Sequence, residues 1–185
     1  MSFEYNLPRP MNKIKFAREA ARVERTHASP GIGSHSVGSH TFNMLTMLLI
    51  MWPDAPSDLI RAIVQHDIPE RITGDMPHHA KKAGVQNNLV QKQVEFYLNN
   101  LVFGHDALST LPVDRQKWLH GLDMLEFYLW CRDQEMMGNI SIRTKLRAVD
   151  EYMKKYKVNY PEEIVDLYYE ISQAEWETLP DAGGL

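Results

Sequence analysis

The sequence predicts an all-α fold, in which residues 1–185 form a single domain built as a helical bundle. Long segments repeat apolar residues at intervals of three and four, which is the spacing of one face of a helix, and no segment alternates convincingly as a strand would. The 185-residue chain, with 44% apolar residues, can bury one sizeable core. Proline and glycine separate the helical segments, as is typical of short connections.

The first expected helix covers about residues 11–24 and delivers Arg25 to the start of a loop over residues 26–37. A loop of this length in a compact domain is more often functional than idle. A second helix is expected over residues 36–52, with Ser36 as its N-cap and His40 in its first turns. His40 would point inward, where a lone histidine is more often a core residue bonded to a carbonyl than a metal ligand.

The third expected helix begins at Ser57 and ends where His66 and Asp67 stand side by side after an apolar run. A buried carboxylate is unfavourable unless a cation or a donor compensates it, so this pair suggests a metal site. Pro69 should break the helix and so turn Glu70 back toward the pair. The alternative is an ordinary helix-end pair that backbone and solvent satisfy.

A turn is expected over Thr73–Asp75, with its acid on a short polar loop where it could contact a ligand. Lys81 and Lys82 follow in a basic turn, where they could neutralise phosphate oxygens or simply be solvated. A helix over about residues 86–102 is expected to serve as scaffold. The pair His105–Asp106 is expected in a surface loop.

A long helix is expected over about residues 114–137, ended by Gly138. Asp123 is the anomaly of this helix, because apolar neighbours flank it and a buried carboxylate needs a partner, which a metal would supply. Two further amphipathic helices, over about residues 142–156 and 161–179, complete the expected bundle.

Composition argues against several classes of protein. The formal net charge of −4 gives no general attraction to nucleic acid or to anionic membranes. The longest apolar run, Met44–Trp52, is too short to span a bilayer, and no basic leader precedes an apolar segment at the N-terminus. Cys131 is the single cysteine, which excludes an internal disulfide and fits a reducing cytoplasm. We expect a cytoplasmic protein whose partner is a small molecule.

Five sequence features, taken together, resemble the motifs of the HD-domain metal-dependent phosphohydrolases. Their order and spacing, over roughly residues 25–133, are more specific than any one of them. The features are Ser39-His40-Thr41, His66-Asp67, Glu70, Thr73-Gly74-Asp75-Met76-Pro77 and Asp123.

Within that family, the chain resembles both the bacterial 5'-deoxynucleotidases and the phage dATP triphosphohydrolases. The former usually carry arginine-tryptophan and glutamate-histidine-serine where this chain has Arg25-Thr26 and Ser39-His40-Thr41. The loop between these motifs, with the segments that follow it, looks closer to the phage enzymes, which deplete dATP in phages with 2-aminoadenine DNA.

The resemblance implies that His40, His66, Asp67 and Asp123 hold one divalent ion. Nitrogen and carboxylate ligands suit Co(II), Mn(II), Zn(II) or Fe(II) better than Ca(II), and a second divalent ion could accompany a triphosphate. Glu70, acting beside Asp67, would orient the attacking water or pass a proton to the leaving oxygen.

The resemblance also implies substrate contacts. Arg25 would clamp a phosphate, and Asp75, part of the same catalytic group, would accept a hydrogen bond from the sugar 3'-hydroxyl. We expect the loop over residues 26–37 and the side chains of Ile32 and Trp118 to shape the pocket for the base.

The leading expectation is hydrolysis of dATP to deoxyadenosine and triphosphate, and the alternative is removal of phosphate from deoxynucleoside 5'-monophosphates. Lys81, Lys82 and Lys117 would balance a triphosphate tail, which mildly favours the first reaction. Two other classes stay open: a nucleotide-binding regulatory module without turnover, and a helical oligomerisation protein with incidental histidines. The resemblance implies a homo-oligomer, either a dimer or a larger ring such as a hexamer.

Overall fold

The computed structural model describes residues 7, 9–76 and 88–173, and in these ranges the chain is helical, without a strand. This confirms the all-α prediction. The helices are α1 (Pro10–Ala20), α2 (Val37–Met51), α3 (Ser57–Gln65), α4 (Glu70–Thr73), α6 (Asn88–Phe103), α7 (Val113–Met136), α8 (Arg143–Tyr156) and α9 (Glu162–Gln173), with 3-10 turns at Ile140–Ile142 and Lys157–Asn159.

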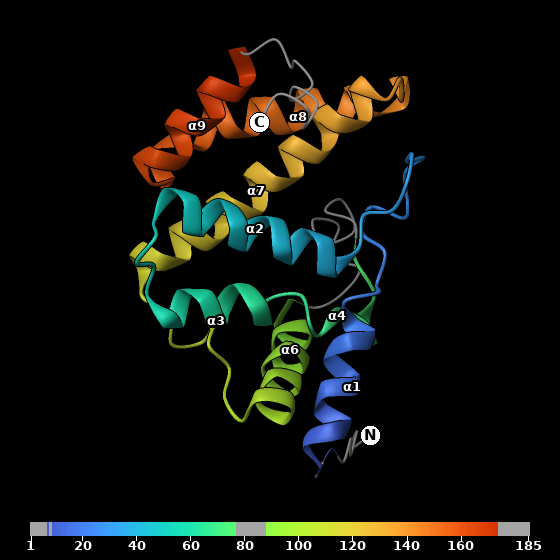
Figure 1. Cartoon of the computed structure of the whole chain (residues 1–185), viewed down its shortest axis with the longest axis vertical. Coiled ribbons are helices and arrows are strands. Elements are labelled where there is room, and N and C mark those ends of the chain that lie inside the picture. The colour runs from blue at the N-terminus through green and yellow to red at the C-terminus, as the bar shows by residue number, and fades with distance from the viewer. Residues whose placement is uncertain (1–6, 8, 77–87, 174–185) are drawn as a thin grey trace, which may run out of the picture.

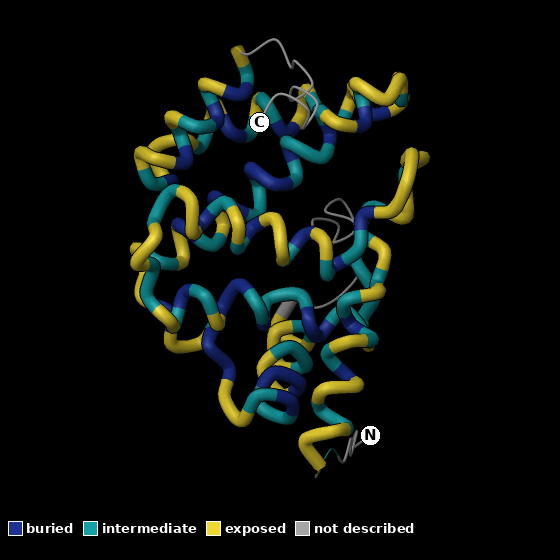
Figure 2. Tube along the Cα trace, viewed as in Figure 1, coloured by how far each residue is buried: buried dark blue, intermediate teal, exposed yellow. Residues whose placement is uncertain are grey.

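Helix α7 crosses the middle of the molecule and contacts α2, α3, α8 and α9, whereas α1 packs against α4 and α6 (Figure 1). The buried positions lie where these helices face one another (Figure 2). Met44, Leu122 and Leu125 belong to the main core around α7, and Phe16 and Leu98 to a smaller core between α1 and α6. Helix α7 is therefore the element on which both the core and any central site depend.

The start of α2 is fixed by a capping box and by close packing on the end of α1. The hydroxyl of Ser36 accepts from the backbone N–H of Ser39 at 3.2 Å, and Ser39 returns the bond, which confirms Ser36 as the N-cap. A Cβ at Gly38 would lie 2.9 Å from the carbonyl oxygen of Ala21. Only glycine fits there. The close approach of Gly38 to Ala21 fixes the first turn of α2, which carries the buried His40.

The predicted break at Pro69 is present. Helix α3 ends at Gln65 with His66 as its C-cap, and Pro69 (φ −60°) is the N-cap of α4. The short helix α4 then ends at Gly74, whose φ of +70° favours glycine. A tight turn that contains His66 and Asp67 therefore joins α3 to α4.

Helix α1 ends at Ala20, earlier than the expected Glu24, because a tertiary contact takes over the backbone bonds. The N–H of Arg25 donates to the carbonyl of His35 at 2.7 Å, and Glu24 forms an isolated bridge with Ser36. The two ends of the 26–36 loop are thereby held together.

The expectation of a surface loop at His105–Asp106 is wrong for Asp106, which is buried. Its Oδ1 accepts from the amide nitrogen of Asn99 at 2.9 Å, and Oδ2 accepts from the N–H of Ser109. The carboxylate is buried because these donors satisfy it. The end of α7 was placed correctly, since Gly138 (φ +87°) follows it.

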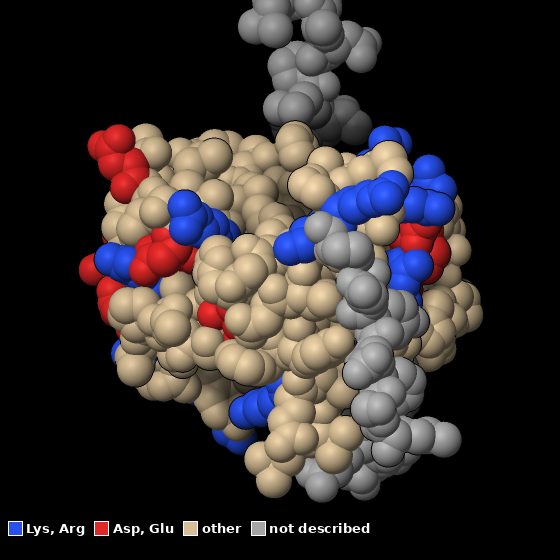
Figure 3. Space-filling model, turned by 90° about the horizontal axis from the view of Figure 1, so that it is seen from below, with Lys and Arg blue, Asp and Glu red and all other residues tan. Residues whose placement is uncertain are grey.

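Charged side chains lie in small groups of both signs on the face seen from below (Figure 3). Within the described residues, no helix is both long and apolar enough to cross a bilayer.

Candidate metal centre

The four predicted metal ligands come together from three parts of the fold. His40 lies in α2, His66 and Asp67 follow the end of α3, and Asp123 lies in α7. Nε2 of His40 is 3.3 Å from Nε2 of His66 and 3.1 Å from Oδ1 of Asp123. Oδ2 of Asp67 is 3.1 Å from Nε2 of His66 and 3.7 Å from Nε2 of His40.

These distances fit a metal ion of the first transition row. Metal–ligand bonds of about 2.0–2.2 Å place neighbouring ligand atoms about 3.0–3.5 Å apart around one ion. Three of these four separations lie in that interval, and the fourth, between His40 and Asp67, is only slightly longer. The described residues thus include a buried or half-buried histidine and aspartate group, His40, His66 and Asp123, that could hold a metal.

The ring of His66 is oriented by the backbone of its own helix. Its Nδ1 lies 2.6 Å from the carbonyl oxygen of Ile63. A carbonyl only accepts, so Nδ1 carries the proton and Nε2 keeps a lone pair for the other ligands.

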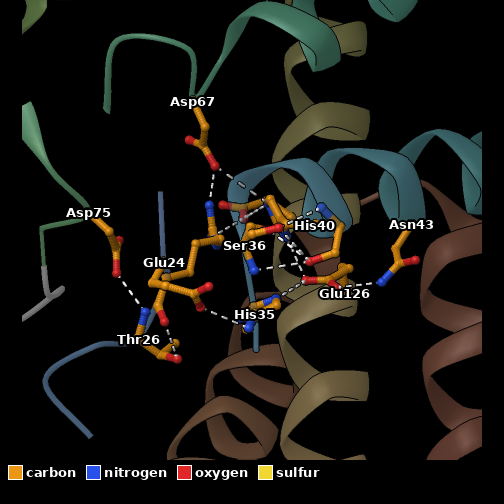
Figure 4. Close-up of polar contacts among 12 residues, drawn as sticks. Glu24, Thr26, His35, Ser36, His40, Asn43, Asp67, Asp75 and Glu126 are labelled. Atoms are coloured by element: carbon orange, nitrogen blue, oxygen red, sulfur yellow. Dashed lines mark hydrogen bonds and ion pairs between the residues drawn. The ribbon is translucent and has the colours of Figure 1, made fainter. Parts of the chain in front are cut away.

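His40 is oriented by a carboxylate that the sequence analysis did not single out. Nδ1 of His40 lies 2.5 Å from Oε2 of Glu126, which is buried in α7 (Figure 4). Glu126 also meets Nε2 of His35 at 3.3 Å and accepts from the amide of Asn43 at 3.0 Å. The available signal was its position three residues after Asp123, on the same face of one helix.

Arg25 lies beside the centre, as expected, but its contacts in the structure are with the carboxylates. Its guanidinium bonds Asp67 and lies 3.4 Å from Oδ1 of Asp123. Burial lowers the pKa of Arg25, but the negative charges of Asp67 and Asp123 outweigh burial and raise the pKa above its ordinary value.

The charges of the centre hold its carboxylates in the ionised form that binds metals. Burial raises the pKa of Asp67 and of Asp123, but the imidazoles of His40 and His66 and the Arg25 guanidinium outweigh it and lower both. Burial lowers the pKa of His40, whereas its hydrogen bonds with Asp123 and Glu126 raise it to about 9. Burial raises the pKa of Glu126, but hydrogen bonds from His35 and His40 lower it to about 2.

Glu70 and Asp75 also lie on the Arg25 side of the centre. The N–H of Glu70 donates to the carbonyl of Asp67 at 3.0 Å, and the charges of Glu70 and Asp75 both help to raise the pKa of Arg25. Oδ2 of Asp75 accepts from the N–H of Thr26 at 2.7 Å (Figure 4). The carboxylates of Glu70 and Asp75 therefore both lie near enough to act on the charge of Arg25.

A pocket of about 340 Å³ opens between the 26–36 loop and α7. Arg25, His35 and Trp130 are among the residues that line it. The loop is pinned to α7, because the side-chain amide of Gln134 bonds both the N–H and the carbonyl of Ile32, at 2.7 and 2.8 Å. The loop thus forms a wall of the pocket, although the Ile32 side chain itself is exposed.

Other predicted substrate contacts are not brought to this place. Trp118 lies in the main core, with its ring 5.4 Å from that of Trp52, because its face of α7 packs on the end of α2. Lys117 is exposed and lies about 120° around α7 from Asp123. Lys81 and Lys82 lie outside the described residues.

Comparison with known proteins gives no independent assignment. No family model matches the chain, and a search of curated proteins found no match. The function therefore has to be argued from the chemistry of the site itself.

Proposed function

We propose that this chain is a metal-dependent phosphohydrolase of the HD-domain type that converts dATP into deoxyadenosine and triphosphate, and so depletes dATP in a phage with 2-aminoadenine DNA. One observation carries the proposal. His40, His66, Asp67 and Asp123 converge from three parts of the fold at ligand spacing, next to a pocket that is lined by the half-buried Arg25.

The proposed cofactor is one ion of Co(II), Mn(II), Zn(II) or Fe(II) held by these four residues, with a second divalent ion accompanying the triphosphate. Such an ion supplies a Lewis acid and a bound water of lowered pKa. Glu70 would hold the attacking water in line with the α phosphorus or pass a proton to the departing 5'-oxygen. A new phosphorus–oxygen bond forms and the bond to the 5'-oxygen breaks.

The remaining roles concern binding. Arg25 would donate to phosphate oxygens, and its position between Asp67 and Asp123 places it at the metal group. Asp75 would accept from the 3'-hydroxyl, since its carboxylate faces Thr26 at the pocket edge. The pocket between the loop and Trp130 would take the base.

A second candidate is a 5'-deoxynucleotidase, and the composition of the pocket favours it. Among the described residues that line the pocket, Arg25 is the single lysine or arginine. One guanidinium suffices for a monophosphate, whereas a triphosphate calls for more positive charge.

Product analysis separates the candidates. Chelator-stripped protein would be incubated with Co(II) or Mn(II) and with dATP, the other deoxynucleoside triphosphates or dAMP, and the products resolved. Deoxyadenosine and triphosphate from dATP support the first candidate. Inorganic phosphate from dAMP, with dATP untouched, supports the second.

The Glu70→Gln variant is the control for chemistry. It should keep the metal and lose turnover, because the metal ligands stay in place and the proton-transferring group does not. Saturable dATP binding without turnover under any divalent metal would instead identify a regulatory module. A chain that binds no metal would be a helical oligomerisation protein.

We also propose that the protein works in the cytoplasm, the host's if it is phage-encoded, as a homo-oligomer, a dimer or a hexamer, without a nucleic-acid or membrane partner. Phe42, Leu49 and Ile50 support assembly, because they are exposed on α2, a helix whose sequence holds no charged residue. Light scattering of the purified chain tests this, and a monomer at micromolar concentration would contradict it.

A further inference from the structure

Glu126 is a buried carboxylate at the meeting point of three donors. Only 2% of Glu126 is exposed, and His40 is fully buried. Oε2 faces Nδ1 of His40 and Nε2 of His35, while Oε1 accepts from the amide of Asn43 (Figure 4). A buried carboxylate with this many partners is held in one orientation.

The short distance between Glu126 and His40 shows whether Glu126 is a metal ligand or a hydrogen-bond acceptor. His35, His40 and Glu126 lie close enough together that they could form a second metal site. However, two ligands of one ion lie about 3 Å apart or more, whereas Nδ1 of His40 and Oε2 of Glu126 are 2.5 Å apart. A separation this short instead fits a hydrogen bond in which the imidazole N–H donates to a charged acceptor.

We propose that Glu126 is a positioning residue that fixes the ring and the tautomer of His40 for metal binding. Glu126 accepts from the Nδ1–H of His40, so Nε2, which faces His66 and Asp123, is the nitrogen left to bind a metal. The inference rests on the metal centre of the proposed function, but not on its substrate.

The same carboxylate connects the metal centre with the pocket wall. The ring of His35 stacks on Trp130 at 4.8 Å and 11°, and the carbonyl of His35 accepts from the N–H of Arg25. His35 is therefore held from three directions. Glu126 thus orients His40 and also bonds His35, whose ring is itself fixed.

Metal titration tests the role of Glu126 without any substrate. In Glu126→Gln the side chain keeps its size and loses its charge. We expect the Kd for Co(II), measured by competition with a chelator, to rise about 10- to 100-fold. The visible absorption bands of bound Co(II) should keep their shape, because the ligands themselves are unchanged.

Two variants serve as matched controls, since they alter the other donors to the same carboxylate. His35→Phe keeps an aromatic ring against Trp130 and removes one donor from Oε2. Asn43→Ala removes the donor to Oε1. Each should change the Kd for Co(II) less than about threefold, because the bond from His40 remains. A wild-type Kd in Glu126→Gln, or equal losses in all three variants, would overturn the proposal.

A measurement on the unaltered protein covers the case in which Glu126→Gln does not fold. Histidine labelled with nitrogen-15 in the Zn(II)-loaded chain reports which ring nitrogen carries the proton, and the signal of His40 is the one lost in His40→Gln. We expect a proton on Nδ1 and metal at Nε2. The reverse tautomer overturns the proposal.

The test of Glu126 in metal binding can be separated from the test of the proposed dATP hydrolysis. If the wild-type chain binds Co(II) and cleaves no deoxynucleotide, the substrate proposal fails and the role of Glu126 stands. If the wild-type chain binds no Co(II), both proposals fail together.

Discussion

Asp67 and Asp123 carry the negative charge of the candidate metal centre, and each lies 3.1 Å from a histidine nitrogen. Their position explains why half-buried acids appear in an apolar part of the fold. Each has cationic and hydrogen-bonding partners that compensate for lost hydration.

Asp123→Asn should abolish metal binding, because the amide keeps the shape of the side chain but loses its charge. We expect a Kd for Co(II) at least about 100-fold weaker and a parallel loss of turnover. Metal content after dialysis and initial rates measure these effects. Asp114→Asn, an exposed acid on the same helix, should leave both unchanged. Full turnover in Asp123→Asn would remove Asp123 from the metal centre.

Arg25→Gln should separate substrate binding from metal binding. Losing the guanidinium should raise the KM for the nucleotide about 10-fold or more, because a charged hydrogen bond to phosphate is lost. The Kd for Co(II) should stay equal or tighten, since Arg25 neutralises the same carboxylates, Asp67 and Asp123, that would hold the ion. Weaker metal binding in this variant would show that Arg25 mainly supports the carboxylates.

Among individual residues, the sequence predicts those that belong to a recognisable motif. The sequence predicts that His40, His66, Asp67 and Asp123 lie close together, because their order and spacing are specific, and the structure brings them together. Glu126 could not be predicted in this way, because its partner His40 lies in another helix and only the packing of α2 on α7 brings them together.

Among the elements, α2 places His40, and the sequence at its start determines how closely it meets α1. Gly38 lies so near Ala21 that a side chain would meet a backbone atom, which cannot move as a side chain could. The first turn of α2 and the end of α1 are therefore fixed relative to each other.

Gly38→Ala should destabilise the fold by about 1–3 kcal/mol, because the added methyl group would force these two segments apart. Urea unfolding at equilibrium measures the free energy. Thr46→Ala, at an exposed position of the same helix, should change it by no more than about 0.5 kcal/mol. Equal stabilities for Gly38→Ala and the wild type would contradict the packing argument.

The helices themselves could be predicted, because apolar spacing of three and four marks them in any context. Their ends could be predicted only where the signal is local, as at Ser36 and Gly138. The early end of α1 depends on the backbone bond that the N–H of Arg25 donates to His35, which no local pattern reveals.

The stability of the whole molecule includes a contribution from Asp150, which joins α8 to α9 and is expected to titrate with pH. Oδ1 of Asp150 accepts from the hydroxyl of Tyr168 at 2.6 Å, and Oδ2 from Lys154 at 2.7 Å. Burial raises the pKa of Asp150, but these bonds outweigh it and lower the pKa below 3.8. A lowered pKa stabilises the folded state above pH 3.8, and this contribution is lost as the pH falls through the folded-state pKa.

Asp150→Asn should therefore lower the free energy of unfolding at pH 7 by about 1 kcal/mol, a value that allows for partial exposure. The difference from the wild type should shrink below the carboxyl's unfolded pKa, because the wild-type group then becomes protonated too. Urea unfolding at pH 7 and at pH 3 measures both differences. A difference that stays constant between the two conditions would rule out this titration.

Helix α7 supplies residues both to the proposed metal group and to the wall of the pocket. Asp123, Glu126, Trp130 and Gln134 follow one another along α7 at intervals of three, four and four, so they occupy about 80° of its circumference. In the proposed site, Asp123 would bind the ion and Glu126 would orient its ligand His40, while Trp130 lines the pocket and Gln134 anchors the loop. Inserting a single amino acid between the first and the last would swing everything beyond it by about 100°. Homologues that accept other substrates should therefore keep the length of this segment and differ in its side chains or in the loop opposite.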